Sequence, residues 1–593
     1  PILLHECRQA GFDTLPVLAV RGTVADRAGF TLNLGAAITS PGNPTRITQA
    51  FDSLGAKTMQ PKQVEFVHPV EMFIRQCKAR GSRLKIADSM GQKMTGTEVL
   101  MRTVILCRLL KEHVLEEGET HVGLLIPPAA GAVLANAALA LDGRTSVNLN
   151  YSATAEVMNE CIRQSGVKHV LTTKKIVEKL NIQLDAPFVY LEELREKVGN
   201  WDKLAGAWAA YVSSADSLVR KYRIKQRNLD DVLTVIFTSG STGMPKGVML
   251  THRNISCVIE GVNDAVVLNS DDVILGVLPF FHSFGFAVPL WTVLASDIAG
   301  VYHFNPLDAP QIGKLCQQYK ATILLATPTF LRSYMKRVAK EDFQSLGVVV
   351  AGAEKLPTEL SDAFEAKYGV RPVEGYGTTE LAPLVSVNQP AARVPSGKKV
   401  RAKEGTVGVP VVHVRVKTLD LDTGKETGIG EPGMLWVAGP NVMKGYMGRP
   451  DLTSESIVDG WYNTGDVAFI DSEGFIHITG RLSRFSKIGG EMVPHILVEQ
   501  KLNEIVCEEK GDMKCAVSSV PDEKKGERLI VLHTAFSMPV DELRDKLIQS
   551  GLPSLFIPGG NAFFLVDELP MLGSGKLDLK QLKETAKAKA ATV

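Results

Sequence analysis

Val235-Ile-Phe-Thr-Ser-Gly-Ser-Thr-Gly-Met-Pro-Lys-Gly-Val248 is the most informative stretch of this 593-residue sequence. It begins as an apolar strand, continues as a loop of glycines and hydroxyl residues, and ends in Pro245-Lys246-Gly247. Glycines let backbone N–H groups approach phosphate oxygens, hydroxyl side chains donate hydrogen bonds, and a lysine adds positive charge. The stretch therefore predicts a loop that binds the phosphates of a nucleotide.

Two other interpretations of this loop fit less well. A Gly/Ser linker would not follow a buried strand or end in a fixed Pro-Lys-Gly. A P-loop NTPase would need Gly, four residues and then Gly-Lys-Ser/Thr, but the fifth residue after Gly240 is Pro245. The residues expected to contact phosphate are Thr238, Ser239, Gly240, Ser241, Thr242, Gly243 and Lys246.

Outward from the loop, short apolar runs alternate with helical stretches from about residue 84, as in an α/β sheet. A helix is predicted over Thr97–Leu110, and Thr95-Gly-Thr-Glu98 fits a capping box at its start. The runs of strand length are His121–Ile126, His169–Leu171, Leu233–Phe237, Ile274–Leu278, Ile323–Ala326 and Leu346–Ala351.

The last third of the chain predicts two smaller units. From Gly405 the sequence is β-like with frequent glycines, which indicates a small β-subdomain. After Gly480-Arg481 a separate α+β domain of roughly one hundred residues is expected, within the usual range for a domain. Its predicted elements are helix Val498–Ile505, strand Cys515–Val520, strand Leu529–Phe536, helix Val540–Ser550 and strand Ala562–Val566.

Composition argues against several classes of protein. With 66 basic and 65 acidic residues the net charge is +1, so no global field favours nucleic acid as a partner. The eight cysteines lie far apart without a CxxC pair, which is typical of reduced, mostly buried thiols in a cytoplasmic protein. The apolar stretch Val122–Leu141 is interrupted by Pro127, Pro128 and Gly131, so a buried strand followed by a buried helix is expected there rather than a membrane span.

Five further motifs follow the glycine loop along the chain in a fixed order. Taken with the loop, they resemble the adenylate-forming superfamily of acyl-CoA synthetases, luciferases and peptide-synthetase adenylation domains, over roughly residues 70 to 580. The motifs are Leu278-Pro-Phe-Phe-His-Ser-Phe-Gly-Phe286, Gly352-Ala-Glu354, Glu374-Gly-Tyr-Gly-Thr-Thr-Glu380, Asp459-Gly-Trp-Tyr-Asn-Thr-Gly-Asp466 and Leu569-Pro-Met-Leu-Gly-Ser-Gly-Lys576.

The resemblance implies binding of ATP with Mg²⁺. Tyr376 would stack on the purine, Thr379 would bind the α-phosphate, and Glu380 would hold Mg²⁺, which prefers oxygen ligands. Asp466 would accept hydrogen bonds from both ribose hydroxyls, and Arg481 would add a cationic contact. The remaining nucleotide-binding residues implied are Gly352, Ala353, Glu354, Gly377 and Thr378. Taken alone, each of these motifs would more simply be a turn or a solvated charge.

The acid pocket is implied by the aromatic motif, with Phe281 and His282 as its lining residues. Aromatic rings with one polar ring suit a carboxylate that has an apolar body. The alternative is a core aromatic cluster with a hydrogen-bonded histidine, since such residues are often simply buried.

Near the C-terminus the resemblance implies two catalytic lysines and a hinge. Lys576 would stabilise charge on the α-phosphate during adenylation, which needs no proton transfer. Lys487, in Gly480-Arg-Leu-Ser-Arg-Phe-Ser-Lys-Ile-Gly-Gly-Glu491, would serve the thioester step after the small domain rotates. The hinge position is Ser483, where the family usually has Asp or Lys.

The predicted domains are an N-terminal extension over residues 1–68, an adenylation domain over 69–480 and a mobile C-terminal domain over 481–593. The C-terminal phrases, such as Arg484-Phe-Ser-Lys-Ile-Gly-Gly-Glu-Met-Val493, resemble the acyl-[acyl-carrier-protein] synthetase half of the bifunctional 2-acylglycerophosphoethanolamine acyltransferase/synthetase. This implies a fatty acid substrate and the phosphopantetheine thiol of acyl carrier protein as acceptor. Free CoA as acceptor and a luciferase-like oxidase stay open as alternatives.

Residues 1–68 are interpreted either as the tail of a truncated acyltransferase domain or as an extension without a catalytic role. In the bifunctional relatives that domain carries a His-x-x-x-x-Asp pair. Neither histidine of residues 1–68 is followed five positions on by Asp, and the pattern occurs in this chain only at His303 and Asp308, outside that stretch. No phospholipid acyltransferase activity is expected from this chain. A link to lysophospholipid, or to the inner face of the membrane, would come through the missing upstream domain.

Overall fold

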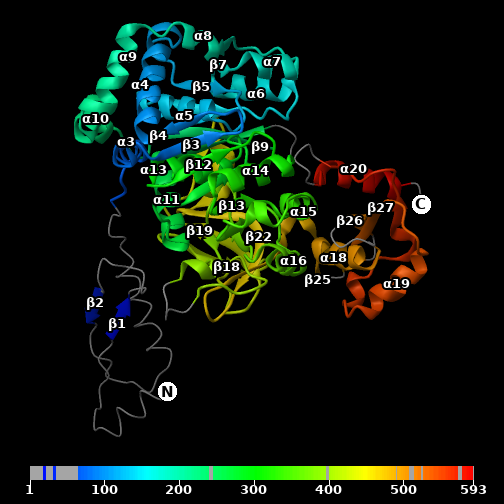
Figure 1. Cartoon of the computed structure of the whole chain (residues 1–593). Helices are drawn as coiled ribbons and strands as arrows, with labels where there is room; N and C mark the ends of the chain where they lie inside the picture. Colours follow the sequence, from blue (N-terminus) through cyan, green and yellow to red (C-terminus); the bar gives the residue numbers. More distant parts are fainter. Residues whose placement is uncertain are drawn as a thin grey trace, which may run out of the picture. The chain divides into compact units, whose positions relative to one another are not determined.

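The computed structural model describes residues 18–21, 31–34, 65–239, 245–394, 400–488, 491–506, 513–522, 525–571 and 577–591 (Figure 1). They divide into two compact units, Pro1–Phe66 and Val67–Val593. In the first unit, β1 (Leu18–Arg21) pairs antiparallel with β2 (Thr31–Leu34). The second unit has a mixed α/β fold, as predicted.

One sheet of the second unit carries the predicted phosphate loop. Its strand order is β20-β10-β9-β6-β5-β7-β8, in which β9, β6, β5, β7 and β8 are parallel and β10 is antiparallel to its neighbours. The strands are β5 (His121–Leu124), β6 (Thr145–Asn148), β7 (Val170–Thr172), β8 (Phe188–Tyr190), β9 (Val232–Ser239), β10 (Pro245–Thr251) and β20 (Gly445–Tyr446). The loop therefore connects the two strands of a β9–β10 hairpin.

A second sheet has the order β17-β16-β15-β14-β13-β11-β12-β3-β4. Every residue of β11, β12, β13 and β14 is buried, as parallel strands covered by helices on both faces require. The strands are β3 (Leu84–Asp88), β4 (Lys93–Thr95), β11 (Val273–Gly276), β12 (Ala299–Tyr302), β13 (Ile323–Ala326), β14 (Val348–Ala351), β15 (Val373–Tyr376), β16 (Ser386–Val387) and β17 (Val409–Pro410).

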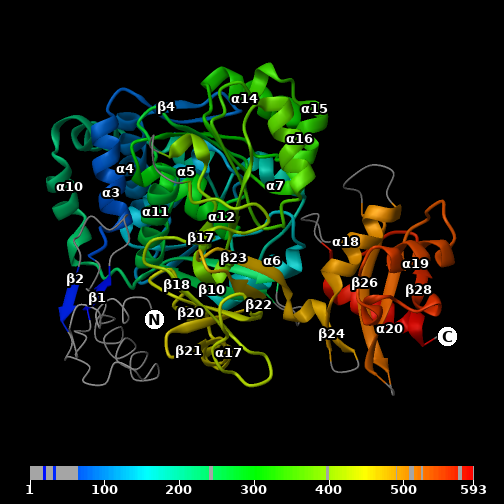
Figure 2. The ribbon, with the colours of Figure 1, turned by 90° about the horizontal axis from the view of Figure 1, so that it is seen from below.

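Helices pack on these two sheets, and Figures 1 and 2 both show α14, α15 and α16 together. The capping box is confirmed: Thr95 Oγ1 accepts from the Glu98 N–H, and the Glu98 carboxylate accepts from the Thr95 N–H. The helices are α3 (Pro69–Arg80), α4 (Gly96–His113), α5 (Ala130–Asp142), α6 (Ala155–Ser165), α7 (Lys174–Leu180), α8 (Leu191–Glu196), α9 (Asn200–Ala207), α10 (Ala215–Lys221), α11 (His252–Val266), α12 (Ser283–Gly285), α13 (Val293–Ala295), α14 (Ala309–Tyr319), α15 (Pro328–Arg337), α16 (Thr358–Tyr368) and α17 (Pro450–Ser456).

The stretch Val122–Leu141 forms most of β5 and α5, so the expected strand and helix are confirmed. Within the part of the chain that the structure describes, none of the helices has both the length and the apolar character needed to cross a bilayer. The cysteines described there are buried and unbridged: Cys77, Cys107, Cys161, Cys257, Cys316 and Cys515.

A smaller antiparallel sheet follows from Arg415, in the β-like region predicted from the glycine-rich sequence. Its order is β18-β19-β22-β21, with β23 paired to β22. The strands are β18 (Arg415–Leu419), β19 (Gly433–Ala438), β21 (Ile457–Val458), β22 (Trp461–Ile470) and β23 (Ile476–Arg481). The short turn η7 (Leu482–Arg484) leads from β23 into the last sheet.

The last sheet, in orange and red in Figure 2, separates two hydrophobic clusters. Cys515 and Val517 of β26 pack with α18 and α19, whereas Ala516 and Val520 pack with α20, because alternate residues of a strand face opposite sides. Its elements are β24 (Phe485–Ile488), β25 (Glu491–Pro494), α18 (His495–Val506), β26 (Cys515–Asp522), β27 (Gly526–His533), α19 (Val540–Gln549), β28 (Phe563–Leu565) and α20 (Leu579–Ala590). The elements predicted for this region are confirmed to within a few residues.

Candidate active site

The two ends of the predicted phosphate loop lie side by side. Thr238 of β9 is the cross-strand neighbour of Lys246 of β10, and Ser239 is the neighbour of Pro245. The antiparallel pairing thus brings a hydroxyl residue and a lysine to the base of the same loop. Gly240, Ser241, Thr242, Gly243 and the side chain of Ser239 lie outside the described residues.

Tyr446 joins Lys246 to Glu380. The Lys246 Nζ lies 5.5 Å from the centroid of the Tyr446 ring, and the Tyr446 hydroxyl donates a 2.8 Å hydrogen bond to Glu380 Oε1. Burial, reinforced by the Glu380 carboxylate, raises the pKa of Tyr446, so the phenol keeps its proton and remains a donor. The Met443 N–H also donates to the Glu380 carbonyl, at 2.8 Å, which fixes the backbone of this residue.

Tyr376 and Arg481 both contact Asp466. The Tyr376 hydroxyl donates to Asp466 Oδ2 at 2.5 Å, and Arg481 Nε lies 3.3 Å from Asp466 Oδ1. Asp466 and Arg481 are cross-strand partners in β22 and β23. Burial raises the pKa of Asp466, and the opposing effects of Arg481 and Tyr376 favour the carboxylate. Since a carboxylate has about four acceptor sites, Asp466 retains capacity for further donors such as ribose hydroxyls.

The backbone between Tyr376 and Glu380 is tightly constrained. A Cβ on Gly377 would lie 1.3 Å from the Pro383 carbonyl oxygen, so this position accepts only glycine. Thr378 Oγ1 is buried and has no hydrogen-bond partner among the described residues. A buried hydroxyl without a partner costs free energy, and a ligand oxygen would remove that cost. Thr379 Oγ1 lies 3.2 Å from Ser283 Oγ, which ties this segment to the aromatic motif.

Gly352, Ala353 and Glu354 follow β14 directly. A Cβ on Gly352 would lie 3.0 Å from the Phe284 ring, so the aromatic motif reaches this segment as well. Ala353 has a φ of 68°, in the left-handed region. The Glu354 carboxylate accepts from the Thr329 hydroxyl at 2.8 Å, next to the N-terminus of α15, where a negative charge is favourable. Glu354 therefore has a structural contact of its own.

Some residues of the aromatic motif are buried in the core and others are exposed. Phe280 and Phe286 are fully buried, which agrees with the core interpretation for these two rings. The Phe281 ring meets Tyr151 edge to face, with centroids 4.9 Å apart. His282 is exposed, and its Nδ1 accepts from the Phe284 N–H at the start of α12.

Two catalytic lysines and a hinge residue are predicted in the part of the chain that follows Arg481. Lys487 of β24 pairs with Met492 of β25, and Ser483 lies in the turn η7, but the side chains of Lys487 and Ser483 lie outside the described residues. Lys576 also lies outside them, in the segment 572–576. The flanks of that segment are held together by a β-bridge between Met571 and Leu577.

Sequence reasoning missed Tyr446, Tyr151 and Glu374 as contacts of this site. Tyr446 belongs to a two-residue strand whose pairing with β10 spans a long stretch of sequence, and no local pattern marks it. Glu374 begins a quoted motif; its carboxylate accepts from the Leu356 N–H at 3.3 Å, and burial raises its pKa to about 7. Its place as the first residue of that motif was the sequence signal that could have identified it.

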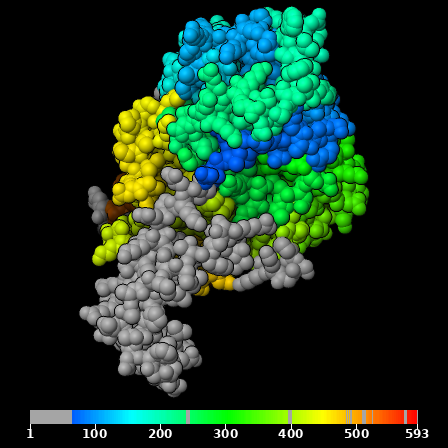
Figure 3. Space-filling view, turned by 90° about the vertical axis from the view of Figure 1, so that its left-hand side faces the viewer, coloured from blue at the N-terminus to red at the C-terminus, as the bar shows by residue number. Residues whose placement is uncertain are grey.

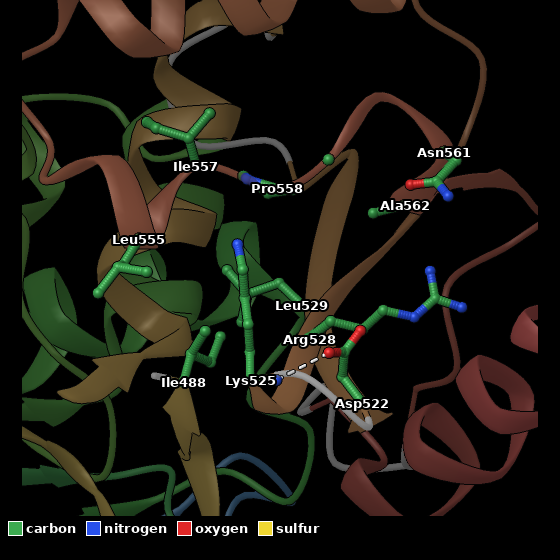
Figure 4. A pocket seen from close by; sticks show the side chains of 11 residues that line it. Ile488, Asp522, Lys525, Arg528, Leu529, Leu555, Ile557, Pro558, Asn561 and Ala562 are labelled. Atoms are coloured by element: carbon green, nitrogen blue, oxygen red, sulfur yellow. Dashed lines mark hydrogen bonds between the residues drawn. The ribbon is translucent and has the colours of Figure 1, made fainter. Parts of the chain in front are cut away.

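A separate cavity of about 360 Å³ lies in the C-terminal sheet, and none of the predicted site residues lines it (Figure 4). Its walls are apolar at Ile488, Leu529 and Leu555, and Lys525 and Arg528 bring charge to it. The Lys525 N–H donates to Asp522 Oδ1 at 2.9 Å. This arrangement closes the turn between β26 and β27.

The chain belongs to the AMP-binding enzyme family, whose profile matches residues 73–447. Feruloyl-CoA synthase of an Amycolatopsis species is 34% identical over 357 residues, which cover 59% of this chain and 69% of that protein. The long-chain-fatty-acid–CoA ligase of Escherichia coli O157:H7 is 26% identical over 558 residues, covering 88% and 95%.

Solved structures share the fold. The ATP-bound RpMatB-BxBclM chimera B3 matches with a TM-score of 0.70 and 25% identity, over 88% of this chain and 99% of that one. The o-succinylbenzoate CoA synthetase from Bacillus subtilis, in complex with its acyl-adenylate intermediate, matches with a TM-score of 0.72 and 24% identity, over 86% and 98%.

Proposed function

We propose that this chain is an AMP-forming acid:thiol ligase that activates a long-chain fatty acid and transfers it to the phosphopantetheine of acyl carrier protein. The observation that carries the ligase chemistry is the meeting of Lys246 and Glu380 at Tyr446, within the matched family region. A lysine and a carboxylate at one point suit a phosphate chain with its cation. The two relatives named above, a feruloyl-CoA synthase and a long-chain-fatty-acid–CoA ligase, support the same reaction class.

The nucleotide would be held by three sets of residues. Lys246 and the glycine loop would bind the phosphates, Thr378 and Thr379 would donate hydroxyls, and Asp466 would accept from the ribose. Glu380 would hold Mg²⁺, which would neutralise charge on the phosphates. Mg²⁺ keeps several waters and needs only one or two carboxylates beside phosphate oxygens.

The proposed reaction has two steps. The carboxylate oxygen of the acid attacks the α-phosphorus of ATP, which forms the acyl-AMP and releases pyrophosphate. The thiol then attacks the acyl carbonyl, which forms the thioester and releases AMP. Lys576 would stabilise the charge that develops in the first step, and Lys487 would serve the second.

The choice of acid and the choice of acceptor are supported by different observations. The edge-to-face pair of Phe281 and Tyr151 would supply apolar surface for a long acyl chain, and a long-chain-fatty-acid–CoA ligase aligns along most of its length. Carrier protein as acceptor rests on the C-terminal phrases around Lys487 and Lys576. Because the relatives are named as CoA ligases, free CoA is the second candidate acceptor.

Acid-dependent exchange of labelled pyrophosphate into ATP tests the first step. Fatty acids of increasing length should support exchange at least about tenfold better than ferulate, and Glu380→Gln should abolish it. Glu359→Gln, on the exposed surface of α16, is the matched control and should behave as wild type. Exchange with none of these acids would refute the ligase proposal, and a preference for ferulate would refute the fatty acid.

The acceptor is tested with the same acid and two thiols. Holo acyl carrier protein should yield thioester at a higher kcat/KM than CoA. The reverse preference would replace carrier protein by CoA in the proposal and leave the first step unaffected.

A further inference from the structure

Helix α9 and the π-helical turn η1 (Trp208–Val212) that continues it turn an apolar face to solvent. The side chains of Trp201, Leu204, Trp208, Tyr211 and Val212 are 78%, 55%, 59%, 70% and 59% exposed. They recur at helical spacing along one face, where a surface helix ordinarily carries polar residues. Clusters of exposed aromatic residues of this kind mark interaction sites.

The opposite face of the same segment is fixed to the body of the protein. Asp202 is buried and accepts from Arg108 Nε of α4 at 3.0 Å. A Cβ on Gly206 would lie 2.6 Å from the Ile105 side chain, so the backbone of α9 packs directly on α4. Lys78 Nζ donates to the Ala210 carbonyl at 2.7 Å. The aromatic face therefore cannot turn inward to bury itself.

The segment that carries this face and continues through α10 is rich in basic residues. Residues 200–227 contain six basic and two acidic residues. Both acidic residues are paired outside the segment, Asp202 with Arg108 and Asp216 with Arg75 at 2.6 Å. The exposed basic residues are Lys203, Arg220, Lys221, Arg223 and Lys225. Figure 1 shows α9 and α10 together at one edge, and Figure 3 shows that edge facing the viewer.

This combination suits a lipid surface better than a folded partner. Tryptophan and tyrosine rings sit at the headgroup level of bilayers, and lysine and arginine attract anionic lipids. The aromatic side chains stand out from a convex helix, so a fluid interface can accept each of them without a preformed pocket. Since α8 carries exposed Glu192 and Glu193, insertion of the rings should contribute more than charge.

We propose that α9 and η1 form a membrane-docking element, which inserts Trp201, Trp208 and Tyr211 into the interface of a bilayer containing anionic phospholipids. The element uses none of the residues assigned to the ligase reaction, so the proposal stands or fails independently of that function. It would hold the chain at the surface where long-chain acids partition.

Flotation of the whole chain with vesicles tests the proposal. Vesicles of phosphatidylcholine with phosphatidylglycerol should bind the chain, and the triple variant Trp201→Ser/Trp208→Ser/Tyr211→Ser should bind at least about tenfold less. Ile429→Ser is the matched control, because Ile429 is 76% exposed on the β18–β19 connection, and it should bind as wild type. Equal thermal unfolding midpoints and equal pyrophosphate exchange would show that the triple variant keeps its fold.

Two further measurements separate lipid from other occupants. Brominated lipids should quench wild-type tryptophan fluorescence, and quenching should fall in Trp201→Phe/Trp208→Ser. Lys221→Gln/Lys225→Gln should weaken binding to anionic vesicles, by up to about fivefold for each lysine, and leave binding to pure phosphatidylcholine unchanged. Wild-type chain that does not float would overturn the proposal. The proposal would also be overturned if the chain associated with itself without vesicles, or bound acyl carrier protein, and the triple variant abolished that association.

Discussion

Tyr446 contacts two charged side chains that are far apart in the sequence. Its ring lies beneath the Lys246 ammonium, and its hydroxyl orients the Glu380 carboxylate. Burial raises its pKa, which keeps the hydroxyl protonated as a donor to the carboxylate. The residue is a positioning residue for Glu380 under the proposed function.

Tyr446→Phe should therefore weaken Mg²⁺-dependent pyrophosphate exchange by about tenfold, because a hydrogen bond to a charged group contributes roughly 1.5 kcal/mol. The Mg²⁺ concentration for half-maximal exchange should rise, a change that loss of packing alone would not produce. Tyr319→Phe, a partly buried tyrosine of α14, is the control. An unchanged Mg²⁺ dependence would contradict the role given to Tyr446.

Glu374 is a second residue whose environment has a measurable consequence. Burial raises its pKa from 4.5 to about 7, so the folded protein holds the proton more tightly than the unfolded chain does. Below about pH 4.5 this carboxyl group is protonated in both the folded and the unfolded state, so its raised pKa does not lower the free energy of unfolding. Its cost grows as pH rises from about 4.5 to about 7 and is then constant, at about 3 kcal/mol or less.

Glu374→Gln should remove this cost while keeping an acceptor for the Leu356 N–H. The variant should have a free energy of unfolding about 1–3 kcal/mol above wild type at pH 8, and close to wild type at pH 4.5. Urea unfolding at the two pH values measures the difference. Glu359→Gln should show no such pH-dependent gain; an equal gain in both variants would rule out burial of Glu374 as the cause.

At the scale of elements, helix ends follow local chemistry. Thr95 and Glu98 satisfy each other's backbone N–H groups at the start of α4, as the four-residue pattern predicted. Strands and helices predicted from periodicity agree with the structure to within a few residues, for instance the helix predicted over Thr97–Leu110 and α4. Such elements are predictable because the groups that define them lie within one or two turns of each other.

Thr95→Ala should lower the free energy of unfolding by about 1 kcal/mol, since it removes the side-chain acceptor at the N-cap. Thr97→Ala, inside the same helix, serves as control and should be close to neutral. Equilibrium urea unfolding measures both variants. Equal urea unfolding midpoints for the two variants would show that the Thr95 cap is dispensable.

At the scale of the whole molecule, the proposed reaction needs Lys576 and Lys487 to act in turn. Both belong to the stretch after Arg481, which has its own sheet and its own hydrophobic clusters. A unit with its own core can move as a body about a few connecting residues. The expected domains 69–480 and 481–593, with Ser483 at the hinge, remain a proposal on this basis.

Lys576→Ala should abolish acid-dependent pyrophosphate exchange and spare thioester formation from supplied acyl-AMP. Lys487→Ala should do the opposite. Single-step assays with synthetic acyl-AMP measure the second reaction directly. Equal loss of both steps in both variants would contradict the division of labour.

The sequence by itself determined the α/β class, most element positions and the motifs around Lys246, Glu380 and Asp466, because these depend on short-range periodicity and on residue chemistry at fixed spacing. Tertiary structure alone decided that Tyr446 joins Lys246 to Glu380 and that Tyr376 binds Asp466. It also decided that the apolar face of α9 points outward, since Gly206 lets the backbone rather than the aromatic rings pack on α4. These contacts arise from pairings between distant strands and helices, which no local pattern encodes.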